Sequence, residues 1–533
     1  MTRNVVNLDA LLPREDLASE AESTADIPGL KLSDLEKGLI YSWLRKPDFQ
    51  RETANWSPEQ IADLIETFVK GNIIPSIILW QSGNRVFVID GAHRLSALIA
   101  WVRDDYGAGK ISAELYQNII PEHQRTLHNM TRELVHGKIG SYEEHLAAAQ
   151  FPGAAKPEVL KRATQFPFRS IDVQWIRNAS VDQARDAFFR INQGGTEIEA
   201  TETRILRAKS SPLALSSRAI SRGGSGHNYW RKFDTQRQAE IQTLGAELQK
   251  LLFAPPLQQP VKTLDVPLAG FGYGSHVLPF AFDLVARTNR LTVADSTRRK
   301  TLEKESSASD DPDGLETLSC LTATRKTVRL ICSNHPSSLG LHPALYFYTP
   351  DGAFHSAALF NAADWFTDLD SKGYLNDFLQ LRERFESLIL SHPVIVKPPS
   401  HKLGSGTRTK ARTVALYERI FELMSKGASP EDVWSTIVEE PNFLFLKPAD
   451  QDEKVKSLSG TPGRPFARGA KSAAFFSQAF PSAPKCSLCG GLLHVNGMVV
   501  DHKQVKTEGG SSASANARMV HPICNSNREA IGL

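Results

Sequence analysis

The chain has 533 residues, of which 41% are hydrophobic and 23% are charged, and its formal net charge is only +3. A chain of this length is expected to form two to four domains with ample core. The small net charge excludes a basic field over the whole molecule, so any nucleic-acid surface must be local. The chain has no apolar signal segment at its start and no run of about eighteen apolar residues, which predicts a soluble, cytoplasmic protein without a membrane span.

An amphipathic helix is predicted after residue 57. Ser57 is a suitable N-cap, Pro58 takes the first helical position, and Gln60 completes a capping box. Apolar residues then recur at helical spacing as far as Val69, which indicates one buried face. The preceding residues 1–35 are mixed and polar, and we expect them to form an N-terminal arm.

Two strands and a second helix follow this first helix. Residues 73–80 and 85–89 are predicted to be strands, and the sequence DGAHR at 90–94 opens a helix. Backbone N–H groups and the dipole of a helix N-terminus favour an anion at such a turn. Asp90 is a candidate base or magnesium ligand. The alternative is a tight structural turn in which Arg94 forms a salt bridge, and this motif alone does not decide between them.

Three motifs in a fixed order carry a family resemblance over roughly residues 35–210. They are PDFQR at 47–51, VIDGAHR at 88–94 and FFRINQGGT at 188–196. This series resembles the N-terminal domain of the DUF262 family, which is related to ParB and sulfiredoxin folds. The resemblance implies an α/β nucleotide-binding domain at 36–210 and an association with restriction of foreign, often modified, DNA.

The resemblance also assigns nucleotide-contacting residues, which are Arg51, Asp90, His93, Arg94, Arg190 and Asn192. Ala92-His93 stands where the family usually has two glutamines, so the choice of nucleotide and its hydrolysis stay open. The alternative for residues 192–195 is a helix C-cap with glycines at positive φ.

Residues 211–450 are predicted to be mainly helical. Apolar residues recur at helical spacing in four segments, at 236–253, 276–288, 362–392 and 413–424. A basic stretch without acidic residues precedes the last of these, and we expect a mobile loop there that contacts DNA phosphates. Its DNA-binding candidates are Lys402, Arg408, Lys410 and Arg412. A solvated loop is the alternative. Residues 451–484 are rich in Pro, Gly, Ser and Ala and are expected to form a basic linker.

The last fifty residues contain two short metal-type pairs. Cys486 and Cys489 form a C-x-x-C pair, and His521 and Cys524 form an H-x-x-C pair. Two such pairs a few tens of residues apart can supply the four ligands of a tetrahedral structural zinc. The other cysteines are too few for a disulfide framework, and Cys320 and Cys332 are expected to be buried reduced thiols.

Between and after the two pairs lie Asp501-His502, at the end of an apolar run, and then Asn516 and Asn525. This arrangement resembles the zinc-knuckle subgroup of the HNH nucleases, which implies a ββα-metal domain at 485–533. His521 stands where many members have Cys, and Asn525 where some have His.

The chemistry of these side chains fits phosphodiester cleavage. Near-neutral His502 can take a proton from water. Asp501 and Asn525 can hold one Mg²⁺, and Asn516 would hold the loop that orients His502. The alternative is a zinc knuckle that binds without cutting.

The sequence as a whole predicts an α+β multidomain protein with a ParB-like N-terminal domain, a helical middle and a C-terminal HNH domain. The leading hypothesis is a bacterial defence-type DNA endonuclease, gated by a nucleoside triphosphate or by recognition of modified or phage DNA. The competing hypothesis is a nucleotide-regulated DNA-binding protein whose zinc is only structural. RNA as the substrate, and assembly into a homo-oligomer, stay open.

Overall fold

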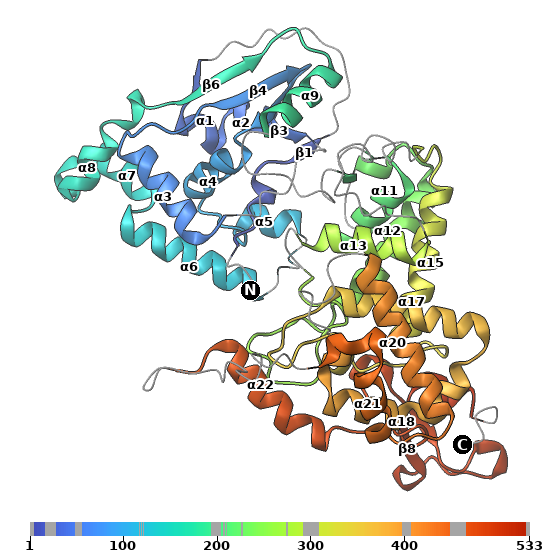
Figure 1. The fold of residues 1–533 in the computed structure, drawn as a ribbon. Coiled ribbons are helices and arrows are strands. Elements are labelled where there is room, and N and C mark those ends of the chain that lie inside the picture. The colour runs from blue at the N-terminus through green and yellow to red at the C-terminus, as the bar shows by residue number, and fades with distance from the viewer. Residues whose placement is uncertain are drawn as a thin grey trace. The chain divides into compact units, whose positions relative to one another are not determined.

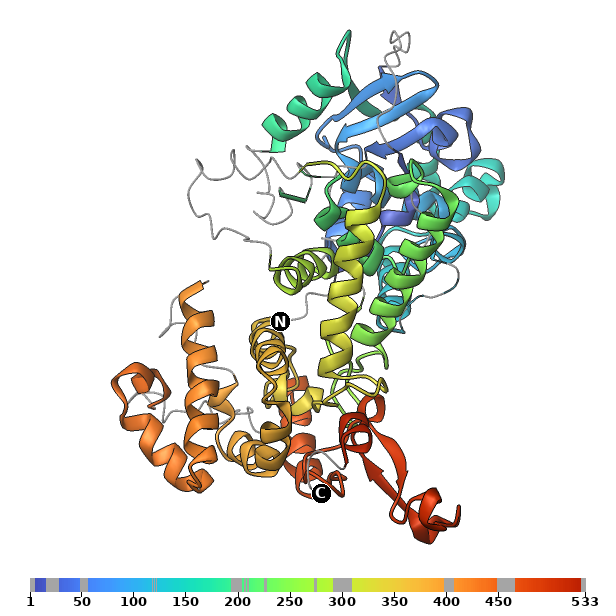
Figure 2. The same cartoon turned by 90° about the vertical axis from the view of Figure 1, so that its right-hand side faces the viewer.

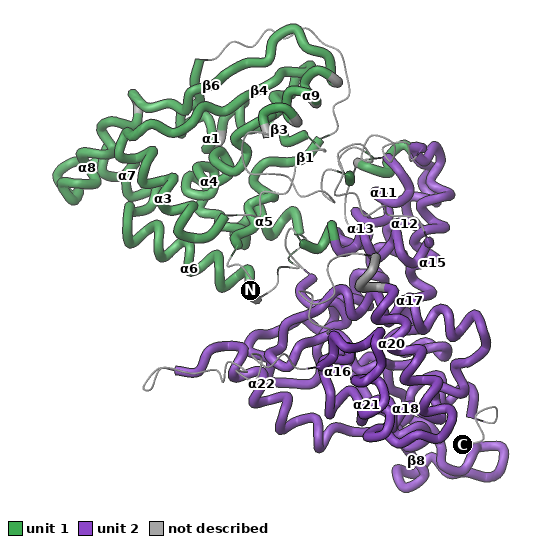
Figure 3. Tube along the Cα trace, viewed as in Figure 1, with its two compact units in different colours: residues 1–209, 226–232, 273–279 green, residues 210–225, 233–272, 280–533 purple. Residues whose placement is uncertain are grey.

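The computed structural model describes residues 5–15, 28–47, 56–116, 118, 120, 122–192, 204–205, 208, 210–224, 228–272, 276–290, 309–396, 407–447 and 465–528. These residues form two compact units of mixed α and β structure (Figures 1 and 3). Unit 1 comprises residues 1–209, 226–232 and 273–279, and unit 2 comprises residues 210–225, 233–272 and 280–533.

Unit 1 is built around a mixed sheet whose described strands run in the order β1-β3-β5-β4-β6-β2. The strands are β1 (Arg14–Glu15), β2 (Gly29–Leu30), β3 (Leu44–Pro47), β4 (Ile77–Ser82), β5 (Arg85–Asp90) and β6 (Ile171–Ile176). β4 and β5 are an antiparallel hairpin in which Ser82 pairs with Arg85, so the turn contains only Gly83 and Asn84. Gly83 has φ 58°, a value that suits glycine and allows this tight connection.

Helices cover both faces of this sheet (Figure 1). The described helices of unit 1, on the sheet and around it, are α1 (Leu32–Lys37), α2 (Leu39–Trp43), α3 (Pro58–Val69), α4 (Ala92–Arg103), α5 (Lys110–Leu115), α6 (Glu122–Lys138), α7 (Tyr142–Gln150), α8 (Pro157–Ala163) and α9 (Val181–Asn192). Side chains alternate along β5 because successive residues of a strand point to opposite faces. Val86 and Val88 join the core formed with α3 and α4, whereas Phe87 and Ile89 pack with Phe188 of α9.

The expected start of α3 is confirmed. The Gln60 N–H donates to Ser57 Oγ at 3.3 Å, and the Ser57 N–H donates to Gln60 Oε1 at 3.0 Å. The N-terminal residues differ from the expected arm, because Val6 and Leu11 are fully buried in the core of unit 1. Asp9 is buried beside them and pairs with Lys46 of β3, so the start of the chain belongs to the folded domain.

Unit 2 is mainly helical and contains all of the following helices apart from residues 277–279 of α13, which belong to unit 1. They are α11 (Pro212–Ser221), α12 (Thr235–Phe253), α13 (Val277–Thr288), α15 (Leu315–Ile331), α16 (Pro343–Tyr346), α17 (Ser356–Lys372), α18 (Leu375–Ser391), α20 (Thr407–Ser425), α21 (Pro430–Glu439), α22 (Arg468–Ala479) and α23 (Pro522–Ser526). An aromatic cluster joins α17, α18 and α20, where the Trp365 ring lies 5.5 Å from Phe385 and 5.3 Å from Tyr417. All three of these rings are buried.

Two segments of unit 2 differ from the sequence prediction. The segment 362–392 is divided between α17 and α18, because Gly373 has φ 77° and ends α17. The basic residues Arg408, Lys410 and Arg412 lie in the first turns of α20 instead of in a loop. Arg412 is exposed, whereas Lys402 lies outside the described residues. The sequence predicted a mobile loop here. For residues 407–412 this prediction is corrected, because these residues form the start of a helix.

The segment expected to be a linker also contains a helix. α22 is held to the rest of unit 2 by Ser472, whose Oγ accepts a hydrogen bond of 3.0 Å from the Val261 N–H. The remaining residues 451–464 lie outside the described part of the chain. After α22 come β7 (Val499–His502) and β8 (Ala517–Val520), which form an antiparallel hairpin followed by α23. This hairpin projects from the helices of unit 2 (Figure 2).

Within the described residues, no helix combines the length and the apolar character that crossing a membrane requires.

Candidate functional site

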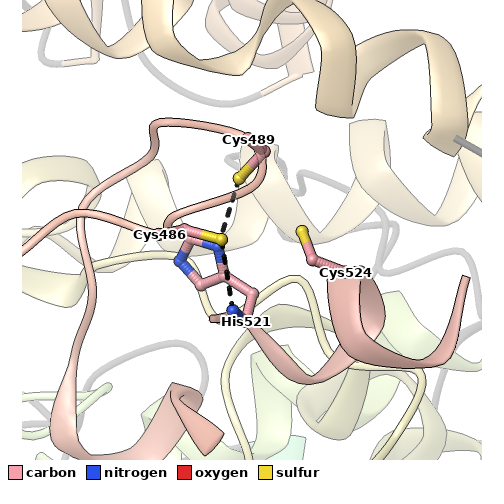
Figure 4. Close-up of side chains that lie close together, drawn as sticks. All are labelled: Cys486, Cys489, His521 and Cys524. Carbon is pink, nitrogen blue, oxygen red and sulfur yellow. Dashed lines mark hydrogen bonds between the residues drawn. The ribbon is translucent and has the colours of Figure 1, made fainter. Parts of the chain in front are cut away.

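The two metal-type pairs converge on one buried point (Figure 4). The ligand atoms of Cys486, Cys489, His521 and Cys524 all lie within 4.8 Å of one another. Cys486 and Cys489 lie in a tight turn closed by a 3.0 Å hydrogen bond from the Gly490 N–H to the Cys486 carbonyl. His521 is the N-cap residue of α23, and Cys524 lies in the first turn of that helix. The hairpin therefore brings the two pairs together.

The donor set fits zinc. Nε2 of His521 lies 3.0 Å from the Leu492 carbonyl oxygen, to which only a protonated nitrogen can donate. Nδ1 is then the nitrogen left to bind a metal, and it lies 3.3 Å from Cys489 Sγ. A hydrogen bond from the ring nitrogen that does not bind the metal typically fixes the tautomer of a ligating histidine. Burial lowers the pKa of His521, which keeps the imidazole in the neutral form that zinc needs.

Hydrogen bonds couple the three buried thiols to one another. The hydrogen bond to Cys486 raises the pKa of Cys489 to about 11, and hydrogen bonds to Cys486 and Cys489 also raise the pKa of Cys524. The pKa of Cys486 is lowered by hydrogen bonds from Cys489 and Cys524. One thiolate is thus stabilised by its two neighbours. A dication would reverse this balance by favouring the charged form of all three.

Asp501 and His502 end β7 and point to opposite faces of the hairpin, because they are neighbours in a strand. The Asp501 side chain faces inward and is paired with Arg518 of β8, whose Nε and Nη2 lie 2.9 Å and 2.8 Å from Oδ2. Oδ1 of Asp501 accepts the His502 backbone N–H at 2.7 Å. Both carboxylate oxygens are therefore engaged by the protein itself.

His502 lies on the more open face of the hairpin. Its side chain is half-buried, and Val500, which precedes it on the same face, is 64% exposed. Among the residues that the structure describes, the His502 imidazole has no hydrogen-bond partner. Asn525 is exposed on α23, and no hydrogen bond joins its side chain to Asp501 or His502 in the same part of the chain. The imidazole and the amide are thus accessible to an external group.

Asn516 closes the loop that follows His502. Its Oδ1 accepts the Gln504 N–H at 2.8 Å, and its Nδ2 donates to the carbonyls of Gln504 at 3.0 Å and Ser511 at 2.7 Å. The Asn516 carbonyl also accepts the Lys503 N–H at 2.7 Å. These bonds fix the chain directly after His502 at a position where the sequence predicted a loop-holding residue.

The expected magnesium ligands do not form a ready-made cation site. Arg518 holds Asp501 Oδ2, and the guanidinium of Arg528 lies 3.8 Å from the same oxygen. Two positive groups beside one carboxylate oppose a cation there. Mg²⁺ prefers several oxygen ligands in octahedral geometry, and the two expected ligands supply only a carboxylate with both oxygens engaged by the protein and one exposed amide.

Sequence reasoning missed Arg518 and Arg528. Arg528 donates to the carbonyls of His502 at 3.0 Å and Lys503 at 2.8 Å and so ties the end of β7 to the residues after α23. The only sequence signal for Arg518 is its place in a strand that could pair with β7, and the register opposite Asp501 appears only in the structure.

The turn before α4 contains the Arg94 salt bridge that the structural alternative predicts, and nucleotide contact at this turn stays a prediction. Gly91 begins α4 with φ 89°, and a Cβ on it would lie 2.5 Å from Ile77 Cγ2. Arg94 Nη2 bonds Asp90 Oδ2 at 2.6 Å and the Ser76 carbonyl at 3.0 Å. The His93 ring lies 5.7 Å from that of Trp56. The arrangement links Asp90 to Arg94 and stiffens the turn.

Of the remaining nucleotide candidates, the structure describes the side chain of Arg190 alone. Arg190 is exposed on α9, Arg51 lies outside the described residues, and nothing is described for the side chain of Asn192. Their roles stay predictions.

Comparison with known proteins gives one match. Residues 31–209 match the family model of the GmrSD restriction endonuclease, N-terminal domain. This domain is of the DUF262 type predicted from the three motifs, and the match begins directly after β2 and covers β3, β4, β5 and β6. The match does not extend to the metal centre or the β7–β8 hairpin. No curated protein and no solved structure matches the chain.

Proposed function

We propose that the protein is a DNA endonuclease of the restriction type and that the β7–β8 hairpin with α23 is its catalytic module. The N-terminal match supports a restriction endonuclease family, whose substrate is DNA. The observation that carries the assignment of the module is His502. Its imidazole stands at the end of β7, on the more open face of a hairpin whose other end leads into the buried metal ligand His521.

The chemistry proposed for His502 is general-base catalysis. The imidazole removes a proton from a water molecule whose oxygen forms a new bond to the phosphorus. The bond from phosphorus to the leaving oxygen breaks, and that oxygen takes a proton from solvent. The zinc would be held by Cys486, Cys489, His521 and Cys524, and its role would be to stabilise a segment too small to fold alone.

A magnesium ion held by Asp501 and Asn525 would neutralise charge on the scissile phosphate. This part of the proposal requires Arg518 to release or share Asp501, because the two form a close ion pair. Substrate phosphate is a competing anion for that guanidinium, and its arrival would favour the exchange.

Unit 1 is proposed to gate the module through a nucleoside triphosphate or through contact with modified or phage DNA. Among the nucleotide candidates, Asp90 ends β5, and His93 and Arg94 lie in the first turn of α4, where the helix dipole favours phosphate. The Asp90–Arg94 ion pair would have to open for Arg94 to reach a phosphate.

The alternative function is a nucleotide-regulated DNA-binding protein with a purely structural zinc. The engagement of Asp501 by Arg518 favours it, because a carboxylate locked in an ion pair would contribute stability instead of metal binding.

The two functions are separated by His502→Ala. We expect plasmid cleavage in the presence of Mg²⁺ to fall by about 10²- to 10⁴-fold, the usual contribution of a general base. Bound zinc and thermal stability should not change, because the imidazole has no described hydrogen-bond partner. His335→Ala is the matched control, since His335 is an exposed histidine of the same unit whose imidazole bonds Ser337.

Wild-type protein is assayed on unmodified plasmid and on plasmid with modified bases, with and without nucleoside triphosphates. Absence of cleavage under all of these conditions would overturn the nuclease proposal. Full activity of His502→Ala would leave a nuclease but remove His502 from its mechanism.

A further inference from the structure

A buried arginine of the helical part of unit 2 reaches the metal centre. Arg382 of α18 is fully buried, and its Nη1 lies 3.3 Å from His521 Nδ1. Its guanidinium also donates to the carbonyls of Leu339 and Gly340 and, through Nε, to Glu386 Oε1 at 2.7 Å. A guanidinium this deep in a protein requires negative or polar partners on every side.

The backbone of the cysteine turn lies directly against this arginine. A Cβ on Gly491 would lie 2.3 Å from Arg382 Nε, and a Cβ on Gly490 would lie 2.7 Å from Glu383 Cδ. Only glycine allows the turn to approach α18 this closely. The Leu492 N–H, directly after the turn, donates to Glu386 Oε2 at 2.6 Å. The metal-binding turn is thus docked on one turn of α18.

The histidine side of the centre is docked on the same part of unit 2. A Cβ on Gly340 would lie 2.7 Å from His521 Cδ2, and the Ile523 N–H donates to the Ser338 carbonyl at 3.0 Å. Arg382 bonds the carbonyls on both sides of this contact. The same guanidinium therefore touches the segment that packs on His521 and the turn that carries the cysteines.

We propose that Arg382 is an outer-shell member of the zinc centre, which neutralises its thiolates and locks the metal-binding residues onto α18. This inference does not depend on whether the hairpin cleaves DNA. In this proposal the zinc site fixes the C-terminal module to the helical part of unit 2.

Charge is the physical reason. Zinc with three thiolates and a neutral imidazole carries a net negative charge, and the site is buried away from water. The guanidinium of Arg382 lies against His521 and the cysteine turn, so its positive charge lowers the cost of keeping the thiolates ionised. Loss of an outer-shell partner typically reduces metal affinity by about 10- to 100-fold.

The test is the zinc affinity of the full chain, measured by competition with a chromogenic chelator, together with the absorption spectrum of the Co²⁺-substituted protein. Arg382→Gln should weaken zinc binding by about 10- to 100-fold. Arg382→Lys should restore part of that loss, because lysine returns the charge without the planar fork of donors. The cobalt spectrum should keep its thiolate charge-transfer bands in every variant that binds metal.

Arg384→Gln is the matched control. Arg384 lies on the same helix and is half-buried, but it donates to the carbonyls of Ala428 and Met424, away from the cysteines. The zinc affinity of the Arg384→Gln protein should equal that of the wild type.

A second variant separates the role in metal binding from a role in pairing with Glu386 alone. Arg382→Met with Glu386→Gln leaves no buried charge, and the new amide oxygen can still accept the Leu492 N–H, so this variant is expected to fold. The proposal predicts that it too binds zinc at least about tenfold more weakly. Wild-type zinc affinity in this folded double variant, or an equal loss in Arg384→Gln, would overturn the proposal.

Discussion

The metal-ligand group and the reactive pair Asp501-His502 lie in the same short module, yet they are built in opposite ways. The four metal ligands point at one another and are buried, and their hydrogen bonds fix the tautomer of His521. Asp501 is held by Arg518, while His502 and Asn525 stay open to solvent on the outside. A structural site is thus complete without an external partner, whereas the proposed reactive site needs a substrate or a cation to complete it.

Removal of the zinc should have the largest effect, and it tests the metal-ligand group, which is the self-contained site of the two. Cys524→Ser, or a chelator, should lower the stability of unit 2 by an amount on the order of 10 kcal/mol, as for other structural zinc sites. Calorimetry of the full chain would record this loss of stability as a lower unfolding temperature of unit 2.

Cys320→Ser is the control for that experiment, because Cys320 is a buried cysteine outside the metal-ligand group. It should retain zinc. A chain that loses zinc without any change in its unfolding transition would contradict the structural role.

A methyl group at Gly491 tests the docking of the cysteine turn. Gly491→Ala places a Cβ against the buried Arg382 side chain, and overpacking of this kind costs about 1–3 kcal/mol. Denaturant unfolding measures the change. Gly137→Ala, at an exposed helical glycine with open space around it, should cost nothing. Equal stability of the two variants would mean that the turn is not pressed against α18.

Acid should weaken unit 2 through His494, which is buried beside Cys332, His342 and Asp265. Burial lowers the pKa of His494 from 6.5 to about 4. As the pH falls below 6.5 the unfolded chain takes up a proton first, so stability is highest above that pH and decreases toward pH 4. The loss between about pH 8 and about pH 5 is about 2 kcal/mol.

His494→Gln should remove this part of the pH dependence, measured by denaturant unfolding at several pH values. The exposed His335→Gln should keep the wild-type slope. An unchanged slope in His494→Gln would show that another group dominates.

Release of Asp501 from its ion pair tests the proposed reactive site, which is the incomplete site of the two. Arg518→Gln removes the guanidinium from the carboxylate and should strengthen binding of a divalent cation by about tenfold, or about 1.4 kcal/mol. Mn²⁺ binding followed by electron paramagnetic resonance measures this without any assay of cleavage. Arg518→Lys keeps the charge and should bind as weakly as the wild type. No difference among the three proteins would remove Asp501 from the proposed cation site.

Several local features of this protein could be predicted from the sequence alone. The capping box at Ser57, the strand-turn-helix around Gly91 and the four metal ligands all depend on residues close in the chain, or on motifs whose spacing fixes their chemistry. The DUF262-type domain was predictable for the same reason, because its three motifs occur in a fixed order.

Only the tertiary structure decided which charges meet. Arg518 faces Asp501 through strand register, and Arg382 reaches His521 across 139 residues of chain. The sequence did not predict that the basic residues before residue 413 belong to α20, or that the residues near Val6 are buried. Polar composition does not reveal what a segment packs against. Pairing and burial over such distances depend on the whole fold, so no local pattern in the sequence encodes them.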